Sequence, residues 1–214
     1  MKEKILKVIA RIGRCLMKAF VYVSFRPKIM YTNPDRKKIR YNEPVIFIGN
    51  HTSHMDGVMS AMIFDRYKAY ILVAKDWFEK KSINWYLRNN LCIPTDRFSV
   101  DTAWLRMTKD AIKAGNSVII YPEGKTGKEL EPDEFKSGFL MVAMLTGAKI
   151  VPFATGEDYH IIFGKRQRVL VGEPMELTAK GKGMNPKYLE EESERFRQII
   201  INLRKQLVRK EETK

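Results

Sequence analysis

The sequence contains little cysteine and histidine and lacks a long apolar run. Its 214 residues include two cysteines and three histidines. Cys15 and Cys92 cannot build a disulfide framework and suit a reducing compartment, and we expect both to be ordinary buried side chains. Charges interrupt every apolar stretch before it reaches about 20 residues, so no transmembrane helix is predicted. The N-terminus also lacks a small-residue cleavage site after its short uncharged run, which argues against a cleavable signal peptide.

Internal repeats and low-complexity linkers are absent as well. The length is enough for one domain with a sizeable core. A hydrophobic content of 44% with 30% charged residues is typical of a globular protein. We therefore divide the chain into an N-terminal segment, residues 1–40, and one main domain, residues 41–214.

Acidic side chains are scarce in the N-terminal segment. Residues 1–40 contain 12 basic and 2 acidic residues, so +10 of the total charge of +14 lies there. A basic surface attracts nucleic acid, anionic lipid or an acidic protein.

Basic and apolar residues of the N-terminal segment recur at three- and four-residue spacing. The basic set is Lys4, Lys7, Arg11, Arg14 and Lys18, and the apolar set is Ile5, Ile9, Ile12, Leu16, Phe20 and Val23. The two sets fall on opposite faces of a helix, a pattern typical of a membrane-interface helix. The alternative is that the apolar face packs on the protein's own core. No nucleic-acid-binding motif accompanies the charge. We expect peripheral or monotopic attachment to the cytoplasmic face of the cell membrane.

From residue 45 onward, apolar runs typical of strands alternate with helical patterns. Strands are predicted at 45–48, 70–74, 92–94, 117–121 and 150–154, and helices at 53–66, 77–89, 100–114, 137–146 and 189–208. Residues 26–40 are interpreted as a connector and 161–171 as a hairpin region. This alternation predicts an α/β domain with a largely parallel central sheet flanked by helices. Ligands of such sheets bind at the carboxyl ends of strands, so the loops after residues 48, 121 and 153 should share one rim.

A histidine and an aspartate follow the first predicted strand, five positions apart. Residues five apart on one helix point about 140° away from each other. His51 and Asp56 can therefore meet only if His51 lies in the turn and Asp56 in the first turn of the next helix, with Thr52 or Ser53 as N-cap. A histidine oriented by a carboxylate can take a proton from a hydroxyl near neutral pH. His54 has no evident third ligand nearby, so no metal site is predicted.

Four segments, in this order, resemble the motifs of the glycerolipid acyltransferase family, whose best-known members acylate lysophosphatidate. They are residues 50–56, 93–97, 121–127 with 135–138, and 150–153. That family is marked by an Asn-His-x-x-x-x-Asp block, an Arg-bearing block after a short strand, a Phe-Pro-Glu-Gly-Thr-Arg-Ser block, and an apolar block around a proline.

The resemblance implies an O-acyltransferase of phospholipid biosynthesis that needs no cofactor, metal or covalent enzyme intermediate. The acyl group would come from acyl-CoA or acyl carrier protein. The acceptor would be a lysolipid hydroxyl, with 1-acyl-glycerol-3-phosphate giving phosphatidate as the leading expectation. His51 would be the general base, and Asp56 would orient it and stabilise the imidazolium. Residues 41–214 would then be the acyltransferase domain, acting on a membrane-resident acceptor.

The resemblance also implies a set of substrate-binding residues. Arg97 would hold the acceptor phosphate by a fork-like contact. Glu123 and Gly124 would shape the acceptor site, and Asn50, Lys125 and Lys136 complete the predicted set. Because a buried carboxylate needs compensation, Lys136 is the expected cationic neighbour of Glu123.

The third block departs from the family pattern. Thr126 occupies the position where the family has arginine, and Lys125 precedes it. A lysine is a point charge and cannot make a bidentate phosphate contact. The acceptor could therefore be lysophosphatidate, another lysolipid or a non-phosphate amphiphile. A hydrolase that uses water and a non-enzymatic membrane lipid-binding protein are further alternatives, although the latter would leave the His51–Asp56 pair unexplained.

Overall fold

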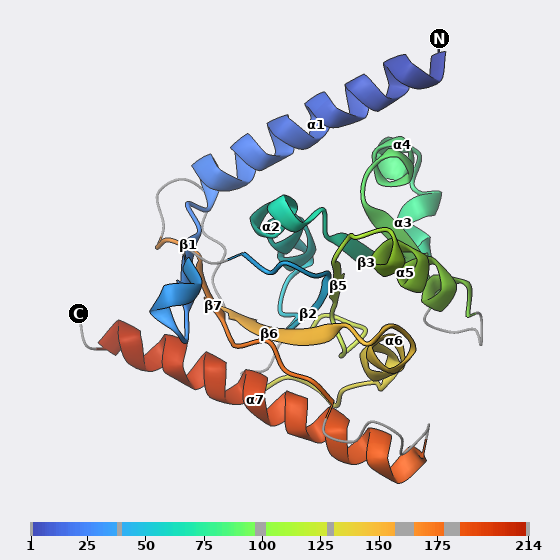
Figure 1. Ribbon diagram of the computed structural model, residues 1–214. Helices are drawn as coiled ribbons and strands as arrows, with labels where there is room; N and C mark the ends of the chain where they lie inside the picture. The colour runs from blue at the N-terminus through green and yellow to red at the C-terminus, as the bar shows by residue number, and fades with distance from the viewer. Residues whose placement is uncertain are drawn as a thin grey trace.

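The protein folds as one seven-stranded sheet between two layers of helices (Figure 1). The computed structural model describes residues 2–37, 40–96, 102–127, 131–156, 165–177 and 185–212. The strand order is β1-β7-β6-β2-β5-β3-β4. The strands are β1 (Lys28–Tyr31), β2 (Val45–Gly49), β3 (Tyr70–Ala74), β4 (Cys92–Thr95), β5 (Val118–Ile120), β6 (Lys149–Thr155) and β7 (Arg168–Val171). Every described pairing except β6 with β7 is parallel, which confirms the predicted fold class.

Helices cover both faces of the sheet. They are α1 (Lys2–Ser24), α2 (His54–Ile63), α3 (Lys75–Glu79), α4 (Lys81–Asn89), α5 (Ala103–Lys113), α6 (Gly138–Thr146) and α7 (Pro186–Glu212), with 3-10 turns η1 (Pro34–Lys37) and η2 (Asp65–Tyr67). Side chains of α1 and α2 share one hydrophobic cluster with the sheet, and those of α5, α6 and α7 share the other. Helix α4 lies beside α1 (Figure 1).

Strand β2 lies at the centre and explains why the first apolar run is continuous. Val45 and Phe47 pack towards α1 and α2, whereas Ile46 and Ile48 pack towards the opposite helices. All four side chains are at most 3% exposed. A parallel strand covered on both faces needs apolar residues at every position.

Three local predictions were wrong or incomplete. Residues 77–89 do not form one helix, because Lys80 adopts an extended conformation and separates α3 from α4. The connector at 26–40 contains β1, an edge strand whose partner β7 is about 140 residues further along the chain, beyond the reach of a local pattern. Cys15 is exposed on α1, whereas Cys92 is partly buried and burial raises the pKa of its thiol to about 11. Within the predicted hairpin region, β7 does pair antiparallel with β6.

Gly49 is the last residue of β2, and an aromatic ring fills the space that a side chain would occupy there. A Cβ at this position would lie 2.4 Å from the nearest ring carbon of Phe153. That ring belongs to a row of aromatic contacts, since Phe153 packs edge-on against Phe64 and Phe64 stacks on Phe47. The small residue at the strand end therefore lets two strands approach closely beside the rim.

We expect Gly49→Ala to destabilise the protein by about 1 to 3 kcal/mol, because the added methyl group must displace a buried ring. Urea unfolding of the purified variant measures this loss. Gly13→Ala is the matched control, since a Cβ there makes an ordinary 3.6 Å contact with Tyr86. That helix-interior change should be neutral or stabilise by about 0.5 to 1 kcal/mol. Equal stability of Gly49→Ala and the wild-type protein would contradict the packing described here.

Candidate active site

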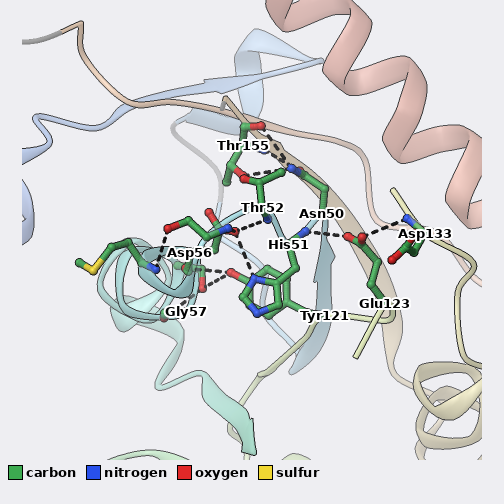
Figure 2. A network of polar contacts seen from close by, with 12 residues as sticks. Asn50, His51, Thr52, Asp56, Gly57, Tyr121, Glu123, Asp133 and Thr155 are labelled. Atoms are coloured by element: carbon green, nitrogen blue, oxygen red, sulfur yellow. Dashed lines mark hydrogen bonds and ion pairs between the residues drawn. The ribbon is translucent and has the colours of Figure 1, made fainter. Parts of the chain in front are cut away.

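His51 and Asp56 meet as their spacing predicts, across the turn that joins β2 to α2 (Figure 2). Ser53 is the N-cap of α2, and its hydroxyl accepts the Met55 N–H. Oδ2 of Asp56 lies 3.1 Å from Nδ1 of His51 and accepts the N–H groups of Thr52 at 2.7 Å and Ser53 at 2.8 Å. The predicted capping position is confirmed, and the aspartate both caps the helix and contacts the histidine.

The contact with Asp56 determines which imidazole nitrogen can act. Asp56 is fully buried, whereas the His51 side chain is 18% exposed. An ionised carboxylate only accepts hydrogen bonds, so the shared proton belongs to Nδ1 of His51. Nε2 then carries a free lone pair. Such a nitrogen can accept a proton from a bound hydroxyl.

His51 lines a cavity of about 610 Å³. Apolar side chains from α1, α2, β3 and α4 make up one part of the lining, including Met17, Val58, Met62 and Leu87, and α1 also contributes Arg14. Another part contains the cationic side chains Lys125 and Lys136 together with Thr126 and Trp104. The lining therefore combines apolar and basic side chains, with the histidine in the same wall.

Glu123 holds the backbone of His51 in place. Its Oε1 accepts the His51 N–H at 2.7 Å, and its Oε2 accepts the Asp133 N–H at 3.0 Å. The side chain is buried, and burial raises the pKa of its carboxyl although the two backbone hydrogen bonds partly offset the rise. Two N–H groups thus satisfy both oxygens of the buried carboxylate. The expectation that Lys136 would be its ion-pair partner is not what the structure shows, because the Lys136 side chain lies over Gly124 instead.

The remaining predicted site residues divide into three groups. Gly124, Lys125 and Lys136 line the cavity, and Lys125 also makes an exposed 3.0 Å ion pair with Asp133. Asn50 does not line it. Arg97 lies outside the described residues.

Asn50 acts as a tie between two strand ends. It is fully buried, its Oδ1 accepts the Thr155 N–H at 2.8 Å, and its Nδ2 donates to Thr155 Oγ1 at 3.3 Å. Figure 2 shows the amide turned towards Thr155 and away from the imidazole. Asn50 therefore makes a structural contact in this structure, and its role in substrate binding stays a prediction.

Two contributors to the site were not predicted from the sequence. The Tyr121 ring stacks on the His51 ring, with centroids 4.4 Å apart. Arg197 of α7 donates from Nε to the carbonyls of Pro132 at 2.8 Å and Asp133 at 3.2 Å, which secures the loop that supplies an N–H to Glu123. The sequence placed Tyr121 at the predicted rim, directly after β5, so its presence near the site could have been inferred. No local pattern in the sequence indicates that Arg197 of α7 contacts the loop at Pro132 and Asp133.

His54 begins α2 and packs edge-on against Trp77, with ring centroids 5.4 Å apart. Over the described part of the chain, no group of three potential metal-ligating side chains is present.

Comparisons with known proteins agree with this fold. A sequence profile of the family described as Acyltransferase matches residues 29–156. The chain is 27% identical over 113 residues to the 1-acyl-sn-glycerol-3-phosphate acyltransferase BAT2, chloroplastic, of Brassica napus, a stretch that is 51% of this chain and 32% of that relative. The match thus spans about a third of the relative's length. The crystal structure of the 1-acyl-sn-glycerophosphate (LPA) acyltransferase PlsC from Thermotoga maritima superposes with a TM-score of 0.61 at 20% identity, covering 97% of this chain and 83% of that one.

One family profile matches more than half of the chain, and the matched part contains the histidine and the buried aspartate that holds it. This match defines the class of the protein. The chain belongs to the acyltransferase family.

We expect Glu123→Gln to lower the free energy of unfolding at pH 7 by about 1 to 3 kcal/mol, because a carboxamide has one acceptor oxygen and leaves one buried N–H without a partner. Chemical denaturation measures the loss. Glu190→Gln, at an exposed position of α7, is the control and should change little.

The difference in the free energy of unfolding between the wild-type protein and Glu123→Gln should depend on pH. The folded pKa of Glu123 is raised, so the unfolded chain releases this proton first. Wild-type stability relative to Glu123→Gln should therefore fall as pH rises above the ordinary value of 4.5 and level off above the raised pKa. A difference that grows with pH in this window would contradict the assigned direction.

Proposed function

We propose that this protein transfers a fatty acyl group from an acyl thioester, acyl-CoA or acyl carrier protein, to the hydroxyl of a lysolipid. The observation that carries the proposal is the aspartate-held imidazole with its free Nε2 in the wall of a cavity whose lining contains both apolar and basic side chains. A ligand with a hydrocarbon chain and an anionic head group matches both kinds of side chain. The proposed acceptor is 1-acyl-glycerol-3-phosphate, which would give phosphatidate in phospholipid biosynthesis.

The proposed chemistry uses His51 twice. Nε2 accepts the proton of the acceptor hydroxyl while the hydroxyl oxygen attacks the thioester carbonyl carbon. The tetrahedral intermediate then collapses with cleavage of the carbon–sulfur bond, and the imidazolium returns the proton to the leaving thiolate. Asp56 stabilises the imidazolium during these steps, as in a Ser-His-Asp site whose hydroxyl is supplied by the substrate.

The apolar part of the cavity suits a hydrocarbon chain. Met17 of α1, Val58 and Met62 of α2 and Leu87 of α4 belong to this part. Burial of each methylene group contributes about 0.8 kcal/mol, so a long chain would be held firmly without any polar contact.

The basic part of the cavity suits the acceptor head group. Lys125 and Lys136 line it, and Arg97 remains the proposed third cation for a phosphate. Two lysines supply attraction without the fixed geometry of an arginine fork. The site therefore favours an anionic head group while leaving its orientation less restricted.

We further propose that α1 attaches the protein to an anionic membrane. The apolar stripe predicted from the sequence does not pack on the protein's own core: Ile12 is 54%, Leu16 66% and Val23 68% exposed. The opposite face of the helix holds it to the protein, where Arg14 and Lys18 both bind Asp65, at 2.6 and 2.8 Å. Among the described helices, none is long and apolar enough to cross a bilayer.

This attachment would bring substrate to the site. Helix α1 carries the exposed stripe and also contributes Arg14 and Met17 to the cavity wall. A lysolipid that resides in the membrane would reach the cavity beside the helix without crossing bulk water. The proposed location is the cytoplasmic face of the cell membrane, with peripheral or monotopic attachment.

His51→Ala should lower the acyl-transfer rate by about 10²-fold or more, since a positioned general base contributes on that scale. Asp56→Asn should also be severely impaired, because the neutral amide no longer stabilises the imidazolium. Initial rates with a radiolabelled acyl thioester measure both, and circular dichroism checks that each variant is folded. His54→Ala is the matched control on the same turn and should stay within a few-fold of wild type. Full turnover by His51→Ala would refute the proposed mechanism.

The double variant Ile12→Gln, Leu16→Gln should weaken binding to anionic vesicles by about 10²-fold or more, because each buried apolar side chain contributes about 2 kcal/mol. Vesicle flotation measures the bound fraction. Leu145→Gln, which changes a 45% exposed leucine on α6, should bind as wild type does. High salt should release the wild-type protein only partly, since screening weakens only the electrostatic attraction. Undiminished flotation of the double variant would show that another surface makes the contact.

A further inference from the structure

Tyr121 contacts both members of the histidine–aspartate pair. Its ring stacks on the His51 ring, with centroids 4.4 Å apart and an interplanar angle of 24°. Its hydroxyl donates to the backbone carbonyl of Asp56 at 2.8 Å and lies 2.8 Å from Ser60 Oγ (Figure 2). One rigid side chain thus spans from the end of β5 to the imidazole and to the first turn of α2.

The tyrosine is itself fixed from behind. Phe153 packs edge-on against it, with ring centroids 6.1 Å apart, and the position of Phe153 depends on the missing side chain of Gly49. Burial raises the pKa of Tyr121 well above its usual value, so its hydroxyl remains a donor over the working pH range. The Tyr121 ring therefore has little freedom to move independently of the sheet.

This arrangement restricts the motion that the Asp56 contact leaves open. With the ring bonded to Cβ and one contact at Nδ1, the imidazole can still tilt about its side-chain torsions, which would shift Nε2 along the cavity wall. A flat surface parallel to the ring blocks that tilt, whereas an aliphatic side chain of similar volume does not define a plane. The hydrogen bond from the Tyr121 hydroxyl to the Asp56 backbone carbonyl fixes the plane of the tyrosine ring relative to the Asp56 carboxylate.

We propose that Tyr121 is a positioning residue that sets the plane of the His51 ring and thereby the direction of Nε2. This inference rests on the proposed role of His51 as general base. The stacked face of Tyr121 performs the positioning, and its hydroxyl holds the ring in place.

The experiment compares Tyr121→Leu and Tyr121→Met, which remove the ring, with Tyr121→Phe, which removes only the hydroxyl. Purified variants are assayed for kcat and for KM of a water-soluble, short-chain lysolipid and of acyl-CoA. Both ring-less variants should lose about 10- to 100-fold in kcat, the scale of a misplaced catalytic group, with both KM values nearly unchanged. Tyr121→Phe should retain most of the kcat while its Tm falls by about 2 to 4 °C.

The matched control is Phe64→Leu, a ring removal in the same aromatic row, where Phe64 stacks on Phe47 at 3.9 Å and does not contact His51. It should lower Tm as much as Tyr121→Leu and leave kcat within about twofold, which separates positioning from general destabilisation. If Tyr121→Leu does not fold, Tyr121→Met and Tyr121→Phe carry the comparison.

Three results would overturn the inference: full kcat in a folded ring-less variant, an equal kcat loss in Tyr121→Phe, or a loss confined to KM. Each of these would leave the proposed function standing, provided that His51→Ala is inactive in the same assay. Activity of His51→Ala would instead refute the proposed function itself.

Discussion

The buried carboxylate of Asp56 is the constraint on which the rest of the site depends. It is fully inaccessible to solvent, and one of its oxygens serves Nδ1 of His51 together with the N–H groups of Thr52 and Ser53. A buried charge is tolerated only when donors surround it, so the turn after β2 must close around this side chain. The same oxygen satisfies the N–H of the N-cap residue Ser53, which favours the start of the helix there, and the positive end of the helix dipole favours the negative charge. The same carboxylate therefore both caps α2 and orients the histidine.

The parallel sheet makes this arrangement stable. Strands β2, β5 and β6 run in one direction, so their carboxyl ends meet, and each end contributes a contact to the turn. Asn50 is tied to Thr155 at the end of β6, while Glu123, just beyond β5, accepts the His51 N–H. An open sheet binds ligands at this edge because the loops diverge there and leave a cavity. The geometry of the candidate site follows from strand direction as much as from the identity of the side chains.

The sequence was sufficient for what depends on local spacing. The sequence correctly predicted that His51 and Asp56 meet across the turn. It also predicted the N-cap, the alternation of strands with helices and the rim shared by the strand ends. Features that depend on contacts between distant segments could not be predicted from the sequence. Strand β1 has little pattern of its own and exists because β7 pairs with it. Lys136 was assigned to Glu123 on charge alone, whereas two backbone N–H groups satisfy that carboxylate, and the contact of Asn50 with Thr155 of β6 was not predicted. Tyr121 shows the same limit, since its ring contact with the histidine requires the end of β5 to lie beside the turn after β2.

Product analysis tests the central claim most directly. The purified protein is incubated with a radiolabelled acyl thioester, offered as acyl-CoA or as acyl carrier protein, and with a panel of lysolipids that includes lysophosphatidate. Acyl transfer predicts label in the diacyl product, release of one thiol for each acyl group transferred, and a preference for acceptors with an anionic head group. Label that appears only as free fatty acid, whether or not a lysolipid is present, would identify a hydrolase and contradict the transfer reaction.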